Sequence, residues 1–230
     1  MAIESRQKEL WLREMQLNGF IVLRRFLPVD YVQAMREELL PLLEAEHAKA
    51  TQDDYSKGRS QGRLALRIAP FADLMRGALA DDRYRKNPVI EELVDAIIGE
   101  KRWKRGWTVC EAVWKGAHFM DWHSDQKIED TDDLDAPHEP IRVIYNIPLI
   151  DFNWATGATE FIPGSHRLPR RFHNSTELLN VPNIYPVPLQ LEVGDAVLRD
   201  GNILHRGTPN LRDEVRPMLD QTYKKIDGAE

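Results

Sequence analysis

The amino-acid sequence predicts a mostly β protein, a β-sandwich or closed β-barrel, with helices supplied by its first hundred residues. After Trp107, short β-favouring runs alternate with Gly, Pro, Asn and Asp, which is typical of closely spaced strands. Before that point, apolar residues recur at helical intervals. No helical pattern separates the later runs, which argues against an alternating parallel β/α architecture. We expect one domain over residues 1–230, with helical support in 1–100 and the β core in 101–230.

The first hundred residues carry four helical patterns and one strand. The run from Gly19 to Leu27 is short and rich in β-branched and aromatic residues, and Pro28 should end it as a strand. Pro41 should kink or divide the second helix. Residues 51–63 have no periodic apolar pattern and predict a loop. The four expected helices span residues 3–17, 31–48, 70–80 and 88–98.

Six short runs in the C-terminal part favour strands, and turn-forming residues separate them. In chain order these runs are TVCEAVW, RVIYNIPLI, ATEFI, LQLEV, DAVLRD and the stretch leading to QTYKKI. Their number and close spacing predict a sheet that closes on itself or packs against a second sheet.

Composition narrows the classes of partner that we expect. The formal net charge is -6, so the chain lacks the broad basic field that nucleic acid or an anionic membrane surface would need. No apolar run approaches the roughly 20 residues of a membrane-spanning helix. The one cysteine, Cys110, has no internal disulfide partner, and the first 20 residues are charged and polar rather than apolar. A cytoplasmic location is the resulting expectation, and the sequence indicates no oligomeric state.

Two candidate metal ligands stand close together in the run DWHSDQ. His123 and Asp125 are separated by one residue, so on extended backbone both side chains leave the same face and can share a metal. His205, in DGNILHRG, is the candidate third ligand, because antiparallel strands can bring it beside the pair. Two histidines and one carboxylate form the facial triad that leaves open positions on iron(II). Because the chain has seven histidines, one His-x-Asp pair can also arise by chance.

Arg216 adds a second feature to this pattern, eleven residues after His205. A guanidinium binds a carboxylate through two parallel hydrogen bonds, so Arg216 is the candidate residue for the far end of a dicarboxylate cosubstrate. The spacing allows a turn and a returning strand. A single arginine considered alone is more often a solvated surface residue.

Four segments, taken together, resemble one known family. They are LNGFIVLRRFLP, the metal pair in WHSD, GATEFIPGSHR, and GDAVLRDGNILHRGTPNLRDEVRP. The chain is similar along nearly its whole length to the phytanoyl-CoA dioxygenase family of iron(II)- and 2-oxoglutarate-dependent oxygenases. This resemblance implies a double-stranded β-helix, a jelly roll of the cupin type with helices packed on it. It also implies iron(II) held by His123, Asp125 and His205, and 2-oxoglutarate anchored by Arg216.

One position departs from some members of the family. Asn146 stands where some relatives carry a tryptophan near the cosubstrate. An amide can hydrogen-bond a carboxylate of the cosubstrate or the substrate, although an ordinary strand residue is an equal alternative. Thr159 and Thr208 are weaker candidates of the same kind. His166, in the Pro-Gly-Ser-His turn, is expected to have a structural role.

The resemblance implies an enzyme that consumes dioxygen and 2-oxoglutarate and hydroxylates an unactivated C-H bond of a small metabolite or natural-product intermediate. The intact Asp125 argues against the related halogenases, in which a small residue replaces the carboxylate ligand. Two other classes stay open. One is a zinc hydrolase or isomerase that uses the same three ligands, and the other is a non-catalytic small-molecule-binding barrel.

The charge of the substrate stays undetermined, because two patches point in opposite directions. The acidic run from Glu129 to Asp135 would favour a cation, whereas Arg167, Arg170 and Arg171 would favour an anion. The first run is also consistent with a solvated loop.

Overall fold

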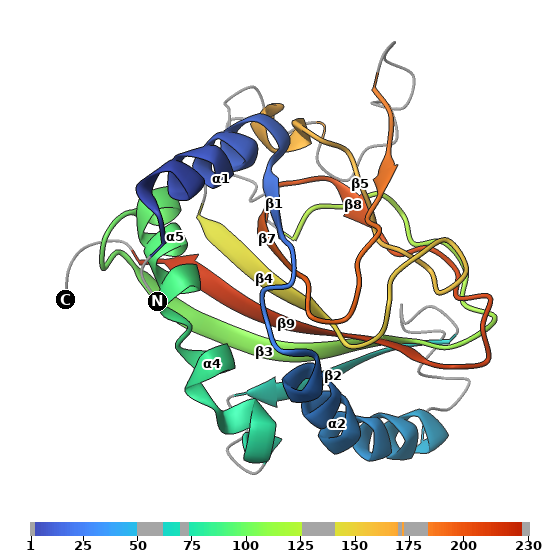
Figure 1. Cartoon of the computed structure of the whole chain (residues 1–230). Helices are drawn as coiled ribbons and strands as arrows, with labels where there is room; N and C mark the ends of the chain where they lie inside the picture. The colour runs from blue at the N-terminus through green and yellow to red at the C-terminus, as the bar shows by residue number, and fades with distance from the viewer. Residues whose placement is uncertain are drawn as a thin grey trace.

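The computed structural model describes residues 3–49, 62–69, 74–125, 141–169, 172 and 184–226, and its core is two facing antiparallel sheets (Figure 1). The large sheet has the strand order β1-β7-β4-β9-β3-β2, and the small one has the order β6-β5-β8. The strands of the large sheet are β1 (Phe20–Leu23), β2 (Arg63–Ala69), β3 (Trp103–Val113), β4 (Arg142–Pro148), β7 (Ala196–Asp200) and β9 (Arg216–Lys225). Those of the small sheet are β5 (Glu160–Phe161), β6 (Val187–Pro188) and β8 (His205–Arg206). The arrangement is a jelly roll, and it confirms the predicted fold class.

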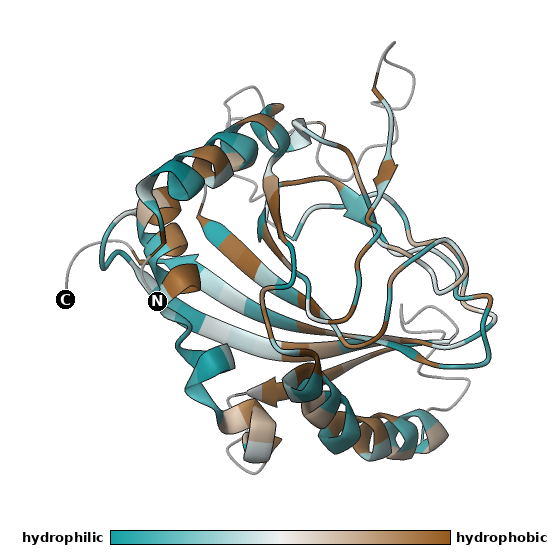
Figure 2. Cartoon of the chain, in the orientation of Figure 1, coloured by the Kyte–Doolittle hydropathy of each residue, from teal (hydrophilic) through white to brown (hydrophobic). Residues whose placement is uncertain are grey.

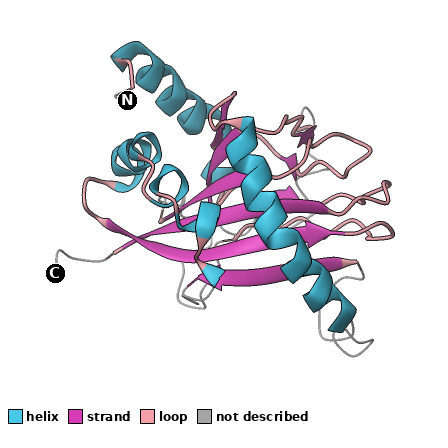
Figure 3. Ribbon diagram, turned by 60° about the horizontal axis from the view of Figure 1, so that its bottom comes forward, coloured by secondary structure: helices cyan, strands magenta, loops and turns pink. Residues whose placement is uncertain are grey.

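Helices cover the outer face of the large sheet, and Figure 3 shows α2 lying across it. The helical elements are α1 (Ser5–Asn18), α2 (Val29–Lys49), η2 (Gly77–Ala80), α4 (Asp82–Arg85), α5 (Pro88–Ile98) and the short η3 (Ser165–Arg167). Polar and apolar residues alternate around α1 and α2 in Figure 2, and the buried residues of α2 and α5 belong to the main hydrophobic core. Burial of each large apolar side chain contributes roughly 1.5–3 kcal/mol. None of the described helices is both long and apolar enough to cross a membrane.

The two faces of each central strand have different surroundings, because successive side chains point to opposite sides. In β4, Val143, Tyr145 and Ile147 belong to the core beneath the helices. Ile144 and Asn146, from the same strand, instead line a cavity between the two sheets. The same alternation in β3, β7 and β9 places polar side chains inside the jelly roll.

Local sequence signals explain where the helices begin and end. Asn87 caps α5, because its side chain accepts hydrogen bonds from the N-H groups of Val89 and Ile90, and Pro88 occupies the first turn. α1 ends at Asn18 and is capped by Gly19, whose φ of 82° is left-handed and whose N-H donates to the carbonyl of Met15. α2 runs unbroken through Pro41, so the expected division of this helix is wrong. Pro41 is exposed, and water can therefore satisfy the carbonyl group that its missing N-H leaves free.

Three other expectations for the first hundred residues need correction. Residues 63–69 form an edge strand, β2, paired with β3, whereas the sequence predicts a loop up to Arg63 and no element over residues 64–69. In place of the helix expected over 70–80, the described part contains the 3-10 turn η2. The first strand, expected to reach Leu27, ends at Leu23 because Arg25 has a positive φ of 49°. Most of the loop expected over 51–63 lies outside the described residues.

A pair of glycine substitutions tests the packing that supports β8. Gly157 has φ +85°, and a Cβ there would lie 2.7 Å from the carbonyl oxygen of Pro209 and 2.9 Å from that of Thr208. Gly116 has a similar φ of +89°, but a Cβ there meets nothing within 4 Å. Both alanine variants bear a left-handed strain of about 1–2 kcal/mol. We expect Gly157→Ala to lose roughly 2 kcal/mol more than Gly116→Ala in urea unfolding, because backbone must move. Equal losses would contradict this packing.

Candidate functional site

The candidate site lies in a cavity of about 280 Å³ between the two sheets. Its floor consists of the inward-facing side chains of β3, β4, β7 and β9, and β2 adds one edge. The segment over residues 120–125 and strand β8 close the other side of the cavity. All three candidate metal ligands, together with Arg216 and Asn146, line this cavity. Thr159 lines it as well, whereas Thr208 is not among its described lining residues.

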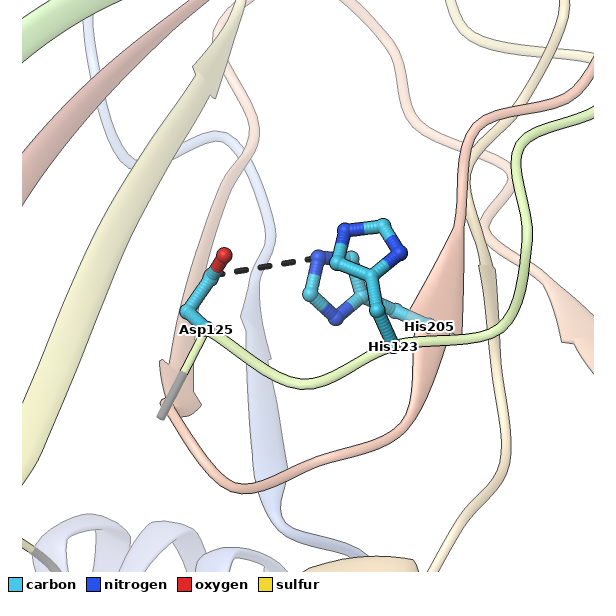
Figure 4. Close-up of side chains that lie close together, drawn as sticks. All are labelled: His123, Asp125 and His205. Atoms are coloured by element: carbon cyan, nitrogen blue, oxygen red, sulfur yellow. Dashed lines mark ion pairs between the residues drawn. The ribbon is translucent and has the colours of Figure 1, made fainter. Parts of the chain in front are cut away.

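Main-chain pairing brings the three candidate ligands together (Figure 4). The N-H of His123 donates to the carbonyl of His205 at 3.1 Å, and the N-H of His205 donates back at 2.9 Å. Asp125 is fixed through its own N-H, which donates to the carbonyl of Gly201 at 3.0 Å. The ligand atoms of the three side chains all lie within 4.8 Å of one another. The pairing is an isolated bridge and not the regular strand that we expected around His123 and Asp125.

Both histidines are oriented for binding through the same ring nitrogen. Nδ1 of His123 lies 2.7 Å from the carbonyl oxygen of Asp121, and Nδ1 of His205 lies 3.0 Å from that of Ile203. A hydrogen on Nδ1 satisfies these carbonyls and leaves the Nε2 lone pair for a metal. Burial, and then the Arg199 cation, lower the pKa of His205 to about 3. His205 is therefore neutral at physiological pH, as a metal ligand must be.

Asp125 is ionised because a buried cation lies against it. Nη2 of Arg199 is 2.6 Å from Oδ2 of Asp125. Burial alone would raise the pKa of this carboxyl, but the Arg199 guanidinium, with smaller effects from the two histidines, lowers it well below its ordinary value. Arg142 also supports this segment by donating from Nη1 to the main-chain carbonyl of Asp125 at 2.8 Å. The donor set is thus two imidazoles and one carboxylate, which suits iron(II).

A chain of hydrogen bonds continues from Arg199 across three strands. Nε of Arg199 donates to Oδ1 of Asn146 at 2.9 Å, and Nδ2 of Asn146 donates to Oδ1 of Asp220 at 2.6 Å. The sheet register sets this order, because Asn146 on β4 is paired with Val197 on one side and Asp220 on the other. Both polar atoms of the Asn146 amide are therefore engaged. In this geometry Asn146 holds Arg199, and a direct bond to a cosubstrate stays a prediction.

Arg216 lines the same cavity, and two of its donor nitrogens are unpartnered among the described residues. It is the first residue of β9, it is 2% exposed, and its guanidinium lies 4.5 Å from the centre of the Phe152 ring. Burial, and then the Arg63 cation, lower the pKa of Arg216 to about 10, so it stays charged at neutral pH. Its Nε and Nη1 are buried and have no hydrogen-bond partner in the described part of the chain. Buried donors of this kind require an acceptor, and a ligand carboxylate would supply it.

Other predicted residues have structural partners or lie elsewhere. The hydroxyl of Thr208 donates to the carbonyl of Ala158 at 2.7 Å, which ties the loop after β8 to the segment before β5. His166 is buried beneath Gly19, where a Cβ would meet its ring at 2.5 Å, so its position agrees with a structural role. The acidic run from 129 to 135 lies outside the described residues, as do Arg170 and Arg171. Arg167 is exposed on η3.

Sequence reasoning missed the charged residues that surround the ligands. Arg199, Asp220 and Glu111 line the cavity, as does Arg63, which donates from Nη2 to the carbonyls of His118 and Thr208 at 2.8 Å each. One signal was present. In DAVLRD, Arg199 interrupts an apolar run whose five strand residues are all buried. A charge in such a run is expected to face a polar site.

Substitution of Asp220 tests its protonation. Burial, and then Glu111, raise the pKa of Asp220 to about 8, whereas an unfolded aspartate titrates near ~3.9. Between these values the folded state binds the extra proton, so this residue makes the protein less stable as the pH rises. An amide cannot ionise and can still accept the bond from Asn146. We expect Asp220→Asn to unfold at a higher temperature than the wild type at pH 9, with a smaller difference at pH 5. Parallel pH profiles would contradict this assignment.

Comparisons with known proteins agree with this geometry. The family model for phytanoyl-CoA dioxygenase (PhyH) matches residues 15–218. The chain is 23% identical to the multifunctional dioxygenase ausE of Aspergillus calidoustus over 90% of this chain and 70% of that one. It is 25% identical to the iron/alpha-ketoglutarate-dependent dioxygenase penM of Penicillium thymicola over 93% and 67%.

Solved structures support the fold. The crystal structure of the non-heme alpha ketoglutarate dependent epimerase SnoN from nogalamycin biosynthesis superposes with a TM-score of 0.68 at 16% identity, covering 96% of this chain and 84% of that one. The carbocyclase SnoK from the same biosynthesis gives a TM-score of 0.60 at 17% identity, covering 98% and 85%. Because the family model spans most of its length, the chain belongs to the phytanoyl-CoA dioxygenase (PhyH) family.

Proposed function

We propose that this protein is an iron(II)- and 2-oxoglutarate-dependent dioxygenase that hydroxylates a C-H bond of a small molecule. The observation that carries the proposal is the sharing of one cavity by two kinds of group. Two imidazoles and a carboxylate converge within 4.8 Å, and Arg216, which lines the same cavity, has two buried donor nitrogens without an acceptor among the described residues. A metal and a carboxylate ligand together would satisfy both.

In this proposal His123, Asp125 and His205 hold iron(II). The fit rests on the neutral state of His205, the ionised state of Asp125 and the free Nε2 positions. Bound iron would supply activation of dioxygen, with 2-oxoglutarate as the reductant that becomes succinate and carbon dioxide. One oxygen atom enters succinate and the other enters the substrate as a hydroxyl group. Three protein ligands leave positions on the metal for the cosubstrate and for dioxygen.

Arg216 is proposed to bind the 5-carboxylate of 2-oxoglutarate. Its guanidinium is already fixed against Phe152, so little rotamer freedom is lost when the carboxylate binds. Phe161, Leu189 and Leu191 form an apolar part of the cavity wall. This wall limits the access of water, which strengthens the pairing between guanidinium and carboxylate.

Hydroxylation is the proposed outcome, although the same centre serves other oxidations. The relatives include proteins named multifunctional dioxygenases, and the structural neighbours include an epimerase and a carbocyclase. Their names support a small metabolite or natural-product intermediate as the substrate. Asp125 keeps a carboxylate in the position that a halide would need. A zinc hydrolase would use the three ligands but would leave the buried donors of Arg216 without a function.

The first test is an anaerobic titration of the iron(II)-loaded protein with 2-oxoglutarate. We expect a metal-to-ligand charge-transfer band, because the 2-oxo acid should chelate the iron. Asp125→Ala should weaken iron(II) affinity by more than about 100-fold, since even residues that only support a ligand contribute roughly 10–100-fold. Asp121→Ala is the matched control, because that exposed side chain is two residues from His123 and only its main chain contacts the site. The absence of the band in the wild type would refute the proposal.

Substitution of Arg216 tests the cosubstrate site separately. Arg216→Met should weaken 2-oxoglutarate binding by roughly 10–100-fold, because charge-assisted hydrogen bonds contribute about 1.5–3 kcal/mol. Iron(II) affinity should stay unchanged. Arg212→Met, at an exposed position before β9, is the control. If Arg216→Met bound 2-oxoglutarate as tightly as the wild type, Arg216 would have no anchoring role.

A further inference from the structure

Arg199 is a second buried guanidinium in the cavity, and no role in the reaction has yet been assigned to it. It is 4% exposed and belongs to β7, and it lines the cavity together with the three candidate ligands. Two of its nitrogens have partners. Nη2 contacts Asp125 at 2.6 Å, and Nε donates to Asn146 at 2.9 Å. Nη1 is buried without a hydrogen-bond partner among the described residues.

The fixed position of this side chain makes the free nitrogen informative. Asn146 holds Nε from the neighbouring strand β4, and Asn146 is itself held by Asp220 on β9. The guanidinium also lies 5.9 Å from the ring centre of Phe161. Because a guanidinium is planar, two fixed nitrogens also fix the direction of the third. Nη1 therefore cannot reach another acceptor by rotation without giving up Asn146 or Asp125.

We propose that Arg199 is a second carboxylate-binding residue of the site, and that its Nη1 holds the 1-carboxylate of 2-oxoglutarate while its Nη2 holds Asp125. This inference rests on the proposed function. The 1-carboxylate would bind the same metal as Asp125, so a donor that touches Asp125 lies beside the positions where the 2-oxo acid chelates. The free donor is then satisfied by the ligand, and an unpaired buried N-H is avoided.

The other arginines around the cavity are less suited to this role. Nη2 of Arg63 is committed to two main-chain carbonyls, and Nη1 of Arg142 donates to the main-chain carbonyl of Asp125. Arg67 is exposed and lies over the ring of Trp107 at 4.7 Å. Arg216 lies against Phe152 at the start of β9. The β9 residues that are level with Arg199 lie near the other end of that strand. Among the described arginines of the cavity, Arg199 and Arg216 are the two with a terminal nitrogen that is both buried and unpartnered, and they thus match the two carboxylates of one dicarboxylate.

Arg199 and Arg216 are expected to bind different parts of the ligand. Two probes make the distinction, 2-oxoglutarate and 2-oxovalerate, which has the same 2-oxo acid end but no 5-carboxylate. Arg216→Met should weaken the binding of 2-oxoglutarate alone, by roughly tenfold or more, and should leave the weak binding of 2-oxovalerate unchanged. Arg199→Met should weaken the binding of both probes by a similar factor, roughly tenfold or more.

The experiment is an anaerobic titration of each variant with each probe, followed by the charge-transfer band at saturating iron(II). Iron(II) affinity is measured separately by competition with a chromophoric chelator, because loss of Arg199 also removes the partner of Asp125. Arg199→Lys provides a second variant. Lysine keeps a cation for Asp125 but cannot supply three fixed donors, so iron affinity should stay near that of the wild type while both probes bind more weakly.

The possible results are distinguishable. If the Arg199 variants bind 2-oxovalerate as tightly as the wild type at saturating iron, Arg199 only positions Asp125, and the inference is overturned while the proposed function stands. If Arg199→Met does not fold, as judged by circular dichroism, the same criterion applies to Arg199→Lys. If the wild type gives no charge-transfer band with either probe, the proposed function fails and the inference fails with it.

Discussion

The removal of charged side chains from water is the constraint on which this site depends. Asp125, Arg199 and Arg216 lie within the cavity between the two sheets, where each charge needs a partner. Half-buried Asp125 and buried Arg199 partner each other at 2.6 Å, and Asn146 further offsets the cost of burying Arg199. Arg216 has no such carboxylate partner in the part of the chain that the structure describes. The imbalance within one cavity is what points to an anionic ligand.

The jelly roll holds these charges in place through its strand register and its outer packing. β7, β4 and β9 are consecutive in the large sheet, and their pairing puts Arg199, Asn146 and Asp220 within hydrogen-bonding reach. The opposite faces of the same strands are apolar and lie under α2 and α5. A rigid outer layer therefore fixes an inner polar layer. The candidate metal ligands come instead from a loop and a two-residue strand, joined by the mutual main-chain bonds of His123 and His205.

Strong local signals made much of this predictable from the sequence. α5 was predicted with the bounds that the structure has, because apolar residues recur at helical intervals over residues 88–98. The β-favouring runs that became β4, β7 and β9 were also recognised, as was the jelly roll. The sequence grouped His123, Asp125, His205 and Arg216 into one candidate site by their order and spacing. In the structure all four line one cavity.

What the sequence did not reveal depends on contacts between distant strands. β2 has two arginines among five apolar residues and, among the described strands, pairs only with β3, so its extended conformation comes from its neighbour. The order Asp125, Arg199, Asn146 and Asp220 exists only through the register of three strands, and no local pattern encodes it. The sequence left Asn146 either as a residue that contacts a ligand or as an ordinary strand residue, and it did not indicate that both of its polar atoms hold other side chains. The sequence can identify which residue types could bind a metal. It does not show which neighbouring residues set their ionisation state and orientation.

The central claim is that one iron(II) ion binds where the two paired histidines meet Asp125. Its most direct test is diffraction from crystals grown without oxygen in the presence of iron(II) and 2-oxoglutarate, with data collected on both sides of the iron absorption edge. We expect one anomalous peak within bonding distance of His123, Asp125 and His205, beside the guanidinium of Arg199. A peak bound by other residues, or no peak at these three side chains, would contradict it.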